Sequence, residues 1–362
     1  MKKNYVKIII SIFVNFYAYM NAMENKSAII LADEHYIKHT CMHWTDKSLV
    51  AIEPLQGGRG GSRLYAVNFE QGEPCVVRLL VSPSAREKAW QEAEISAMKS
   101  ADEAQVGPHI FAAYIKDDGC EIGYVVMQKI NSIAPQEISW NNAITYTQLG
   151  ELLKKMHAQP SVIPVDEEAL YRRAGILIDD LKKKWQVLGI EGFQKKIEKI
   201  KTLFDESKTK LIPHGRTHLM HGDLIGRNLL HDGLRFWAID WENSRVTANP
   251  LFDIALVQDC FVPNEYHTDF MRGYCGQDEL PYDQQKTFPI VRILANCYVG
   301  MAYARIKPQE FVDLFTLYKK SKIDVVRALH SLIHEGYIGD DKDVATYGTL
   351  FFMQGYALLK KI

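Results

Sequence analysis

The stretch "HGDLIGRNLLHDGLRFWAIDWE", residues 221–242, sets two carboxylates and one amide into a run that is otherwise largely apolar. The apolar runs "NLL" and "LRFWAI" lie on either side of an Asp-Gly turn, so they predict a short pair of strands. Asp223 and Asn228 lie at the start of this unit and Asp240 at its end. Loops at strand ends are where polar groups converge on ligands, because the apolar strands fix their positions. We therefore expect these three side chains to belong to one functional site.

These residue types suit phosphoryl transfer. One carboxylate can accept or orient an attacking hydroxyl, while an amide oxygen and a second carboxylate hold the magnesium that bridges nucleotide phosphates. The protein contributes mainly positioning and charge neutralisation, so few residues suffice. The alternative is a polar loop with a few capping aspartates, which the spacing disfavours.

Length and composition limit the other classes of function. A chain of 362 residues, 47% hydrophobic and 24% charged, is typical of a soluble globular protein with two lobes. The net charge of -1, without a Lys/Arg run interleaved with aromatics, argues against a nucleic-acid partner. The six cysteines form no C-x-x-C pair, which favours reduced thiols and a cytoplasmic location. The oligomeric state is left open.

Residues 1–23 form an apolar extension. Lys2, Lys3 and Lys7 precede an apolar run from residue 8 to about residue 20, in a layout like that of a signal peptide. The run is too short for an ordinary membrane span, so no stable span is expected. We expect an extension outside the fold, either a weak anchor or a translation start assigned too early.

The rest of the chain predicts an α+β fold. Residues 24–130 read as a small strand-rich lobe, with strands around the glycine-rich turn "QGGRGGS", a helix near residues 84–100 and a strand pair before residue 130. Residues 131–362 read as a larger, mainly helical lobe, beginning with the amphipathic "TYTQLGELLKKMHAQP".

"HGDLIGRN" followed by "IDWE" is similar to the aminoglycoside phosphotransferase and choline kinase superfamily. The segments "QLGELLKKMHAQP", "NPLFDIA" and "FMRGYC" extend the resemblance, in order, over roughly residues 50–305. Bacterial choline/ethanolamine kinases are the most similar in pattern. The resemblance implies a bilobal protein-kinase-like fold, ATP and magnesium as cofactors, and a small-molecule alcohol as acceptor.

Residue by residue, the resemblance implies roles in the second lobe. Asp223 would be the catalytic base, with Asn228 and Asp240 as the magnesium ligands. His221 would brace the loop and Asp253 would anchor it.

For the first lobe, the resemblance implies the nucleotide contacts. The glycine-rich turn, with Gly58, Gly60 and Gly61, would cover the phosphates, although it lacks a strict G-x-G-x-x-G. Arg78 stands in "CVVRLL" where protein kinases carry a phosphate-pairing lysine. Choline and ethanolamine kinases resemble this chain in having an arginine at that position. A guanidinium grips phosphate oxygens well.

Two further nucleotide-side predictions concern a helix and a hinge. Glu92 is the expected partner of Arg78, with Glu94 a close rival, since residues two apart lie on different sides of a helix. Backbone groups from Gln128 to Ile130 would bind the adenine. The sequence does not show whether the enzyme prefers ATP or GTP as the phosphate donor.

The acceptor is less determined. A cationic amino-alcohol needs aromatic faces and a carboxylate, for which Trp241, Glu242 and Tyr266 are candidates. Acidic residues such as Asp259 could instead line a site for an aminoglycoside. A non-catalytic nucleotide-binding module is a further alternative. A protein kinase is disfavoured, because "DWE" replaces D-F-G and no A-P-E-like element follows.

Overall fold

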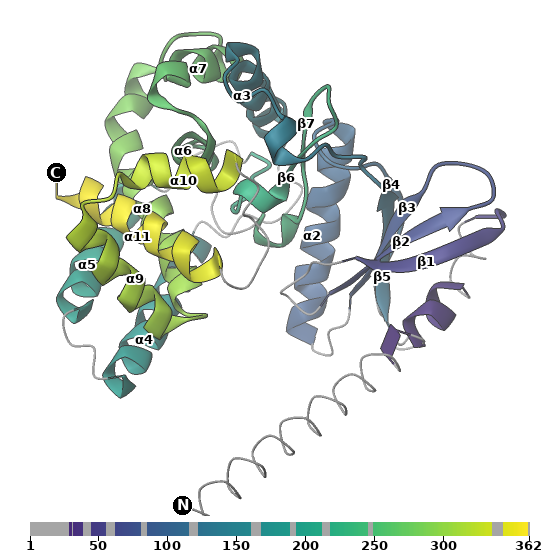
Figure 1. Cartoon of the computed structure of the whole chain (residues 1–362), viewed down its shortest axis with the longest axis horizontal. Coiled ribbons are helices and arrows are strands. Elements are labelled where there is room, and N and C mark those ends of the chain that lie inside the picture. Colours follow the sequence, from purple (N-terminus) through teal and green to yellow (C-terminus); the bar gives the residue numbers. More distant parts are fainter. Residues whose placement is uncertain are drawn as a thin grey trace, which may run out of the picture. The chain divides into compact units, whose positions relative to one another are not determined.

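The computed structural model describes residues 29–30, 32–38, 45–55, 62–80, 85–115, 122–160, 168–188, 193–211, 218–244, 249–334 and 343–360 (Figure 1). The predicted extension, residues 1–23, and the predicted phosphate-covering glycines lie outside these residues. Contacts divide the chain into two compact units, Met1–Ser84 with Ile110–Lys129, and Ala85–His109 with Ile130–Ile362.

The first unit is built on a five-stranded antiparallel sheet of order β1-β2-β3-β5-β4. Its strands are β1 (Leu49–Leu55), β2 (Arg63–Phe69), β3 (Cys75–Leu80), β4 (Ile110–Tyr114) and β5 (Gly123–Gln128). Alternation along β3 sends Val77 and Leu79 into a core that also holds Val126. The side chain of Arg78 therefore leaves the sheet on the opposite face, and it is buried.

A helical segment at residues 32–38 packs against this sheet and was not predicted from the sequence. Ile37 joins the same core as Val77. Asp33 is buried and accepts hydrogen bonds from Arg63 Nη2 at 2.7 Å and from the Tyr65 hydroxyl at 2.5 Å. The segment is thus tied to the first residues of β2 by both apolar and charged contacts.

The second unit is mainly helical, which confirms the predicted α+β class (Figure 1). Its helices are α2 (Ala85–Glu103), α3 (Ala143–Ala158), α4 (Ala169–Val187), α5 (Gln194–Leu211), α6 (Leu251–Phe261), α7 (His267–Cys275), α8 (Tyr282–Ala304), α9 (Pro308–Ser321), α10 (Val325–His334) and α11 (Asp343–Leu359). The expected strand pair is present as β6 (Leu229–His231) and β7 (Phe236–Ala238), paired antiparallel. Its position in the chain agrees with the apolar pattern.

Two close helix contacts shape the second unit. Helix α3 packs on α7 through Gly150 and Gly273, where an added Cβ would overlap the backbone of the facing helix. Helix α11 packs along α8, and a Cβ added at Gly300 of α8 would lie 2.6 Å from the backbone nitrogen of Phe352. Such contacts need glycine because any side chain would force the helices apart.

Within the part of the chain that the structure describes, none of the helices combines the length and the apolar character needed to cross a membrane.

Candidate active site

Asn228 and Asp223 are joined by hydrogen bonds. Asn228 ends the short helical turn η3 (Gly226–Asn228), and its Nδ2 donates to the backbone oxygen of Asp223 at 2.7 Å and to Asp223 Oδ2 at 3.2 Å. Because Nδ2 makes both bonds, the amide presents its other atom, Oδ1, as the oxygen that can bind a cation. The predicted base and one predicted magnesium ligand therefore belong to a single structural unit.

The backbone also ties Asp240 to this unit. Leu229 of β6 pairs with Ala238 of β7, and the Ile239 N–H donates to the Asn228 carbonyl at 2.9 Å. Asp240 follows directly with φ 66° and ψ 68°, in the left-handed region that non-glycine residues rarely adopt. Unusual backbone conformations of this kind cluster at functional sites.

Asp223 lies in an acidic environment. Burial raises the pKa of its carboxyl to about 7; nearby Arg227 opposes that rise, while Asp240 and Glu242 add to it. The Asp223 side chain is still 16% exposed. The three carboxylates thus share one electrostatic neighbourhood with a single described guanidinium, Arg227, acting on Asp223.

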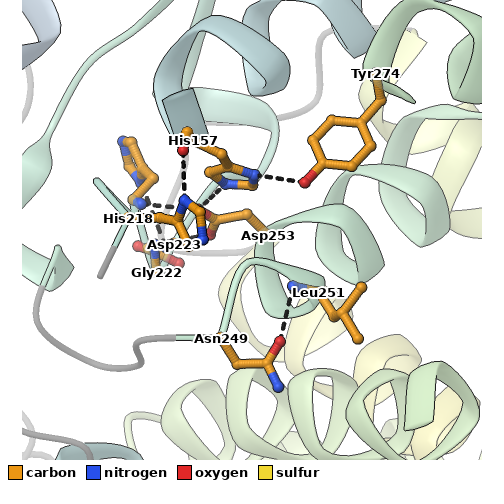
Figure 2. Close-up of polar contacts among 9 residues, drawn as sticks. His157, His218, Gly222, Asp223, Asn249, Leu251, Asp253 and Tyr274 are labelled. Atoms are coloured by element: carbon orange, nitrogen blue, oxygen red, sulfur yellow. Dashed lines mark hydrogen bonds and ion pairs between the residues drawn. The ribbon is translucent and has the colours of Figure 1, made fainter. Parts of the chain in front are cut away.

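Asp253 holds the loop of residues 221–228, called here the catalytic loop. Its two carboxylate oxygens accept the backbone N–H groups of His221 and Gly222, each at 2.8 Å. Figure 2 shows His157, from α3, beside this carboxylate and bonded on its other side to Tyr274 of α7, with Nε2 at 3.4 Å from Asp253 Oδ2 and Nδ1 at 3.2 Å from the Tyr274 hydroxyl.

The charge of Asp253 is stabilised within this network. Burial alone would raise its pKa, but the hydrogen bond from His157 and the His221 contacts outweigh burial, so the pKa lies below its usual value. A fully buried carboxylate that accepts several N–H groups stays ionised. Asp253 can therefore fix the backbone of the catalytic loop.

His221 has both ring nitrogens occupied. Its Nε2 donates to the Ile239 carbonyl at 2.8 Å, and Nδ1 accepts from the Asp223 N–H at 3.3 Å. Burial lowers the pKa of the ring, which keeps it neutral near pH 7. Trp241 of η4 (Trp241–Asn243) packs on it, with ring centroids 4.7 Å apart. The geometry suits a brace between two parts of the site.

The donor set fits magnesium. Amide and carboxylate oxygens are the ligands this ion prefers, and it usually takes few protein ligands beside phosphates and waters. Among the described residues, no three His, Cys, Asp or Glu side chains come together as a metal-binding group. Asn228 Oδ1 and the Asp240 carboxylate offer oxygen donors of this kind, in an environment of excess negative charge that a divalent cation would offset.

The nucleotide-side predictions are only partly visible. Gln128 is the last residue of β5, and Ile130 follows it, half-buried. On α2, Glu94 is buried and Glu92 is exposed. The pairing with Arg78 stays a prediction.

The acceptor candidates lie in different surroundings. Trp241 is buried at 1% exposure, whereas Glu242 is exposed. Tyr266 stacks on Tyr146 with centroids 4.5 Å apart. Asp259, considered for an aminoglycoside, is buried against Arg292 of α8, whose Nε lies 2.7 Å from its Oδ1. Its charge is therefore already compensated inside the protein.

Three residues of the site were not singled out from the sequence: Arg227, His157 and Tyr274. A signal existed for His157, because it continues the buried side of the helix in "LLKKMHAQP". Tyr274 had no local signal, since its contact spans 117 positions of the chain.

The sequence pattern of the Phosphotransferase enzyme family (APH) matches residues 51–284. No curated protein matches the chain in sequence. Solved structures that are similar to the chain include the following three. Spectinomycin phosphotransferase APH(9)-Ia, in complex with ADP and spectinomycin, is 14% identical with TM-score 0.55, covering 87% of this chain and 97% of that chain. A putative fructosamine-3-kinase from Thermobifida fusca is 14% identical with TM-score 0.54, covering 80% and 97%. A choline/ethanolamine kinase family protein from Mesorhizobium loti is 17% identical with TM-score 0.49, covering 86% and 93%.

The structural likeness extends over most of the chain and confirms the predicted kinase-like fold. The family match includes the whole catalytic loop, Asp240 and Asp253. The chain belongs to the Phosphotransferase enzyme family and is an ATP-dependent phosphotransferase of small-molecule hydroxyl groups.

Proposed function

We propose that the protein transfers the γ-phosphate of ATP, with magnesium bound, to the hydroxyl of a cationic amino-alcohol such as choline. The observation that carries the proposal is the Asn228–Asp223 hydrogen-bonded pair, at 2.7 Å and 3.2 Å, in the catalytic loop. It combines the group that would take the acceptor's proton with the group that would hold the metal.

In this proposal the chain's residues position the reactants. Asp223 accepts the hydrogen of the acceptor hydroxyl and orients its oxygen toward the phosphorus. Asp253 and His221 keep the loop backbone fixed while this happens, through the hydrogen bonds described above. Asn228 and Asp240 would hold magnesium, which would supply positive charge to offset the charge of the phosphates during transfer.

The nucleotide contacts are proposed for residues 24–130, and catalysis and acceptor binding for residues 131–362. Gly58, Gly60 and Gly61 would supply backbone N–H groups to the phosphates, and Arg78 a bidentate cation. The backbone of Gln128 and Ile130 would bind the adenine.

For the acceptor, Glu242 is the carboxylate with the most suitable surroundings, since it is exposed and acts electrostatically on Asp223. Tyr266 and Trp241 remain the proposed aromatic contacts. The burial of Trp241 means that its indole can reach a ligand only if the η4 turn shifts, so Tyr266 is the stronger of the two.

An ADP-release screen of the purified full-length protein tests the acceptor. Choline, ethanolamine, thiamine, spectinomycin, kanamycin and a fructosamine are supplied with ATP and magnesium, and EDTA provides the metal-free control. We expect release above the acceptor-free rate with choline or ethanolamine, abolished by EDTA. Stimulation by an aminoglycoside alone would assign the alternative acceptor class. ATP binding without release on any acceptor would favour a non-catalytic module.

A further inference from the structure

Arg227 is a cation inside the proposed catalytic loop to which no role has been given above. It stands directly before Asn228 in η3, and its Nη2 lies 4.0 Å from Asp223 Oδ2. Its side chain is 29% exposed, so the guanidinium is partly shielded and still open to a ligand.

The charges around Arg227 are those of the proposed reaction site. The guanidinium interacts electrostatically with Tyr303, Asp223, Asp240 and Glu242. The group is permanently charged in any case. The guanidinium therefore interacts electrostatically with Asp240, the proposed metal ligand, as well as with Asp223, the proposed base.

The contact with Asp223 does not supply a hydrogen-bond acceptor for the N–H groups of Arg227. A separation of 4.0 Å is an ion pair at its outer limit and is too long for a hydrogen bond. The Nε–H group is buried and finds no hydrogen-bond partner among the residues that the structure describes. A buried donor without a partner is costly, and such groups in native proteins call for an explanation. The exposed part of the guanidinium can be reached by a phosphate oxygen that a substrate supplies.

We propose that Arg227 is a further catalytic residue, which donates hydrogen bonds to the phosphoryl group during transfer. This rests on the proposed function. The bond from phosphorus to the leaving oxygen of ADP breaks as the bond to the acceptor oxygen forms, and the acceptor's proton passes to Asp223. Arg227 keeps all its protons and stabilises the negative charge on the equatorial oxygens, as guanidinium groups do in other phosphotransferases.

A simpler role is possible for the same residue, namely to balance the charge of Asp223 in the resting protein. The two roles differ in what they predict. Charge balance acts equally with and without nucleotide, and lysine can supply it. Stabilisation of the transferred group requires the planar fork of donors and acts only when that group is present.

The test compares Arg227→Met and Arg227→Lys with the control Arg235→Met. Arg235 lies over the Trp237 ring, 3.8 Å from its centroid, on the neighbouring hairpin, and has no proposed catalytic role. Three quantities are measured on each full-length protein: ADP release, the Kd of ADP in magnesium buffer, and the same Kd with aluminium fluoride, which mimics the transferred group.

We expect Arg227→Met to lose about 100- to 1000-fold in turnover. Its Kd for ADP should stay within about threefold, while the tightening by aluminium fluoride seen in the wild type disappears. Arg227→Lys should keep only part of the wild-type turnover and only part of the tightening by aluminium fluoride. Arg235→Met should match the wild type in both quantities. If melting shows that Arg227→Met does not fold, the Lys variant decides by the same criteria.

Wild-type turnover and full tightening in the folded Met or Lys variant would overturn the assignment of Arg227 and leave the proposed function intact. Failure of the proposed function has a different signature. The wild type itself would then show neither ADP release nor tightening, and the inference about Arg227 would fall with it.

Discussion

The side-chain amide of Asn228 donates a hydrogen bond to the backbone oxygen of Asp223 at 2.7 Å. This bond crosses the turn between the two residues, which the Ile225 N–H closes further by donating to the same oxygen at 2.9 Å. The orientation of the amide, and hence the direction of its Oδ1, is therefore set by the fold before any metal binds.

Replacement of Asn228 by Ala should weaken the use of magnesium. The variant loses one proposed ligand, and we expect the magnesium concentration for half-maximal turnover to rise at least tenfold. A magnesium titration of ADP release measures this. The exposed Gln309→Ala variant is the control and should titrate like the wild type. An unchanged midpoint in Asn228→Ala would exclude that residue as a ligand.

Asp253 should make stability depend on acid pH. Its folded-state pKa is depressed, so its contribution is complete above the unfolded value of about 4 and is lost as pH falls through the folded value. At pH 7, Asp253→Asn should lower the free energy of unfolding by roughly 3–5 kcal/mol, because a buried charged partner is removed.

The measurement is urea unfolding of both proteins between pH 7 and pH 3. The difference in free energy of unfolding between the wild type and Asp253→Asn should be constant down to about pH 5 and should become smaller below pH 4. Asp278→Asn, in an exposed pair with Arg272, should change stability by less than about 1 kcal/mol. A gap that widens toward low pH would contradict the assigned ionisation of Asp253.

The α3–α7 contact should tolerate no side chain at its glycines. Gly150→Ala would push a methyl group into the Phe270 carbonyl, so the helices must separate and the Tyr274–His157 bond must lengthen. We expect a loss of stability of roughly 1–3 kcal/mol and slower turnover.

Gly175→Ala is the matched control, because no atom of the described residues lies within 4 Å of the added methyl group in α4. Helix propensity predicts a gain of about 0.5–1 kcal/mol there. Thermal denaturation of both variants separates the two effects. Equal melting temperatures would mean that the close approach of α3 and α7 does not matter.

Glu94 and Glu92 form a second matched pair, two residues apart on α2. If the buried Glu94 serves as the partner of Arg78, Glu94→Gln should raise the KM for ATP about tenfold or more, whereas the exposed Glu92→Gln should leave it unchanged. Steady-state kinetics with varied ATP decides. The reverse order of effects would restore Glu92 as the partner.

Much of the fold was predictable because its signals are local. Alternation gave the strands and the β6–β7 pair, and apolar spacing gave α3. The helical segment at residues 32–38 was missed because it is short and depends on distant contacts, such as the Asp33–Arg63 ion pair across 30 positions. Helices α9 and α10 were likewise not predicted individually.

The site shows the same division between local and distant information. The catalytic-loop residues could be proposed from the sequence because they form one short motif, whereas the choice between Glu92 and Glu94 depends on how α2 packs. Trp241 illustrates the limit best. Its place beside Asp240 suggested a ligand contact, but tertiary packing turns its ring onto His221.

The most direct measurement is the turnover of Asp223→Asn in the ADP-release assay, with ATP affinity measured separately on the same preparation. The substitution keeps the shape of the side chain and removes its capacity to take a proton. Our account predicts a fall in turnover of about two to four decades with ATP affinity nearly unchanged. Turnover at the wild-type rate would contradict it.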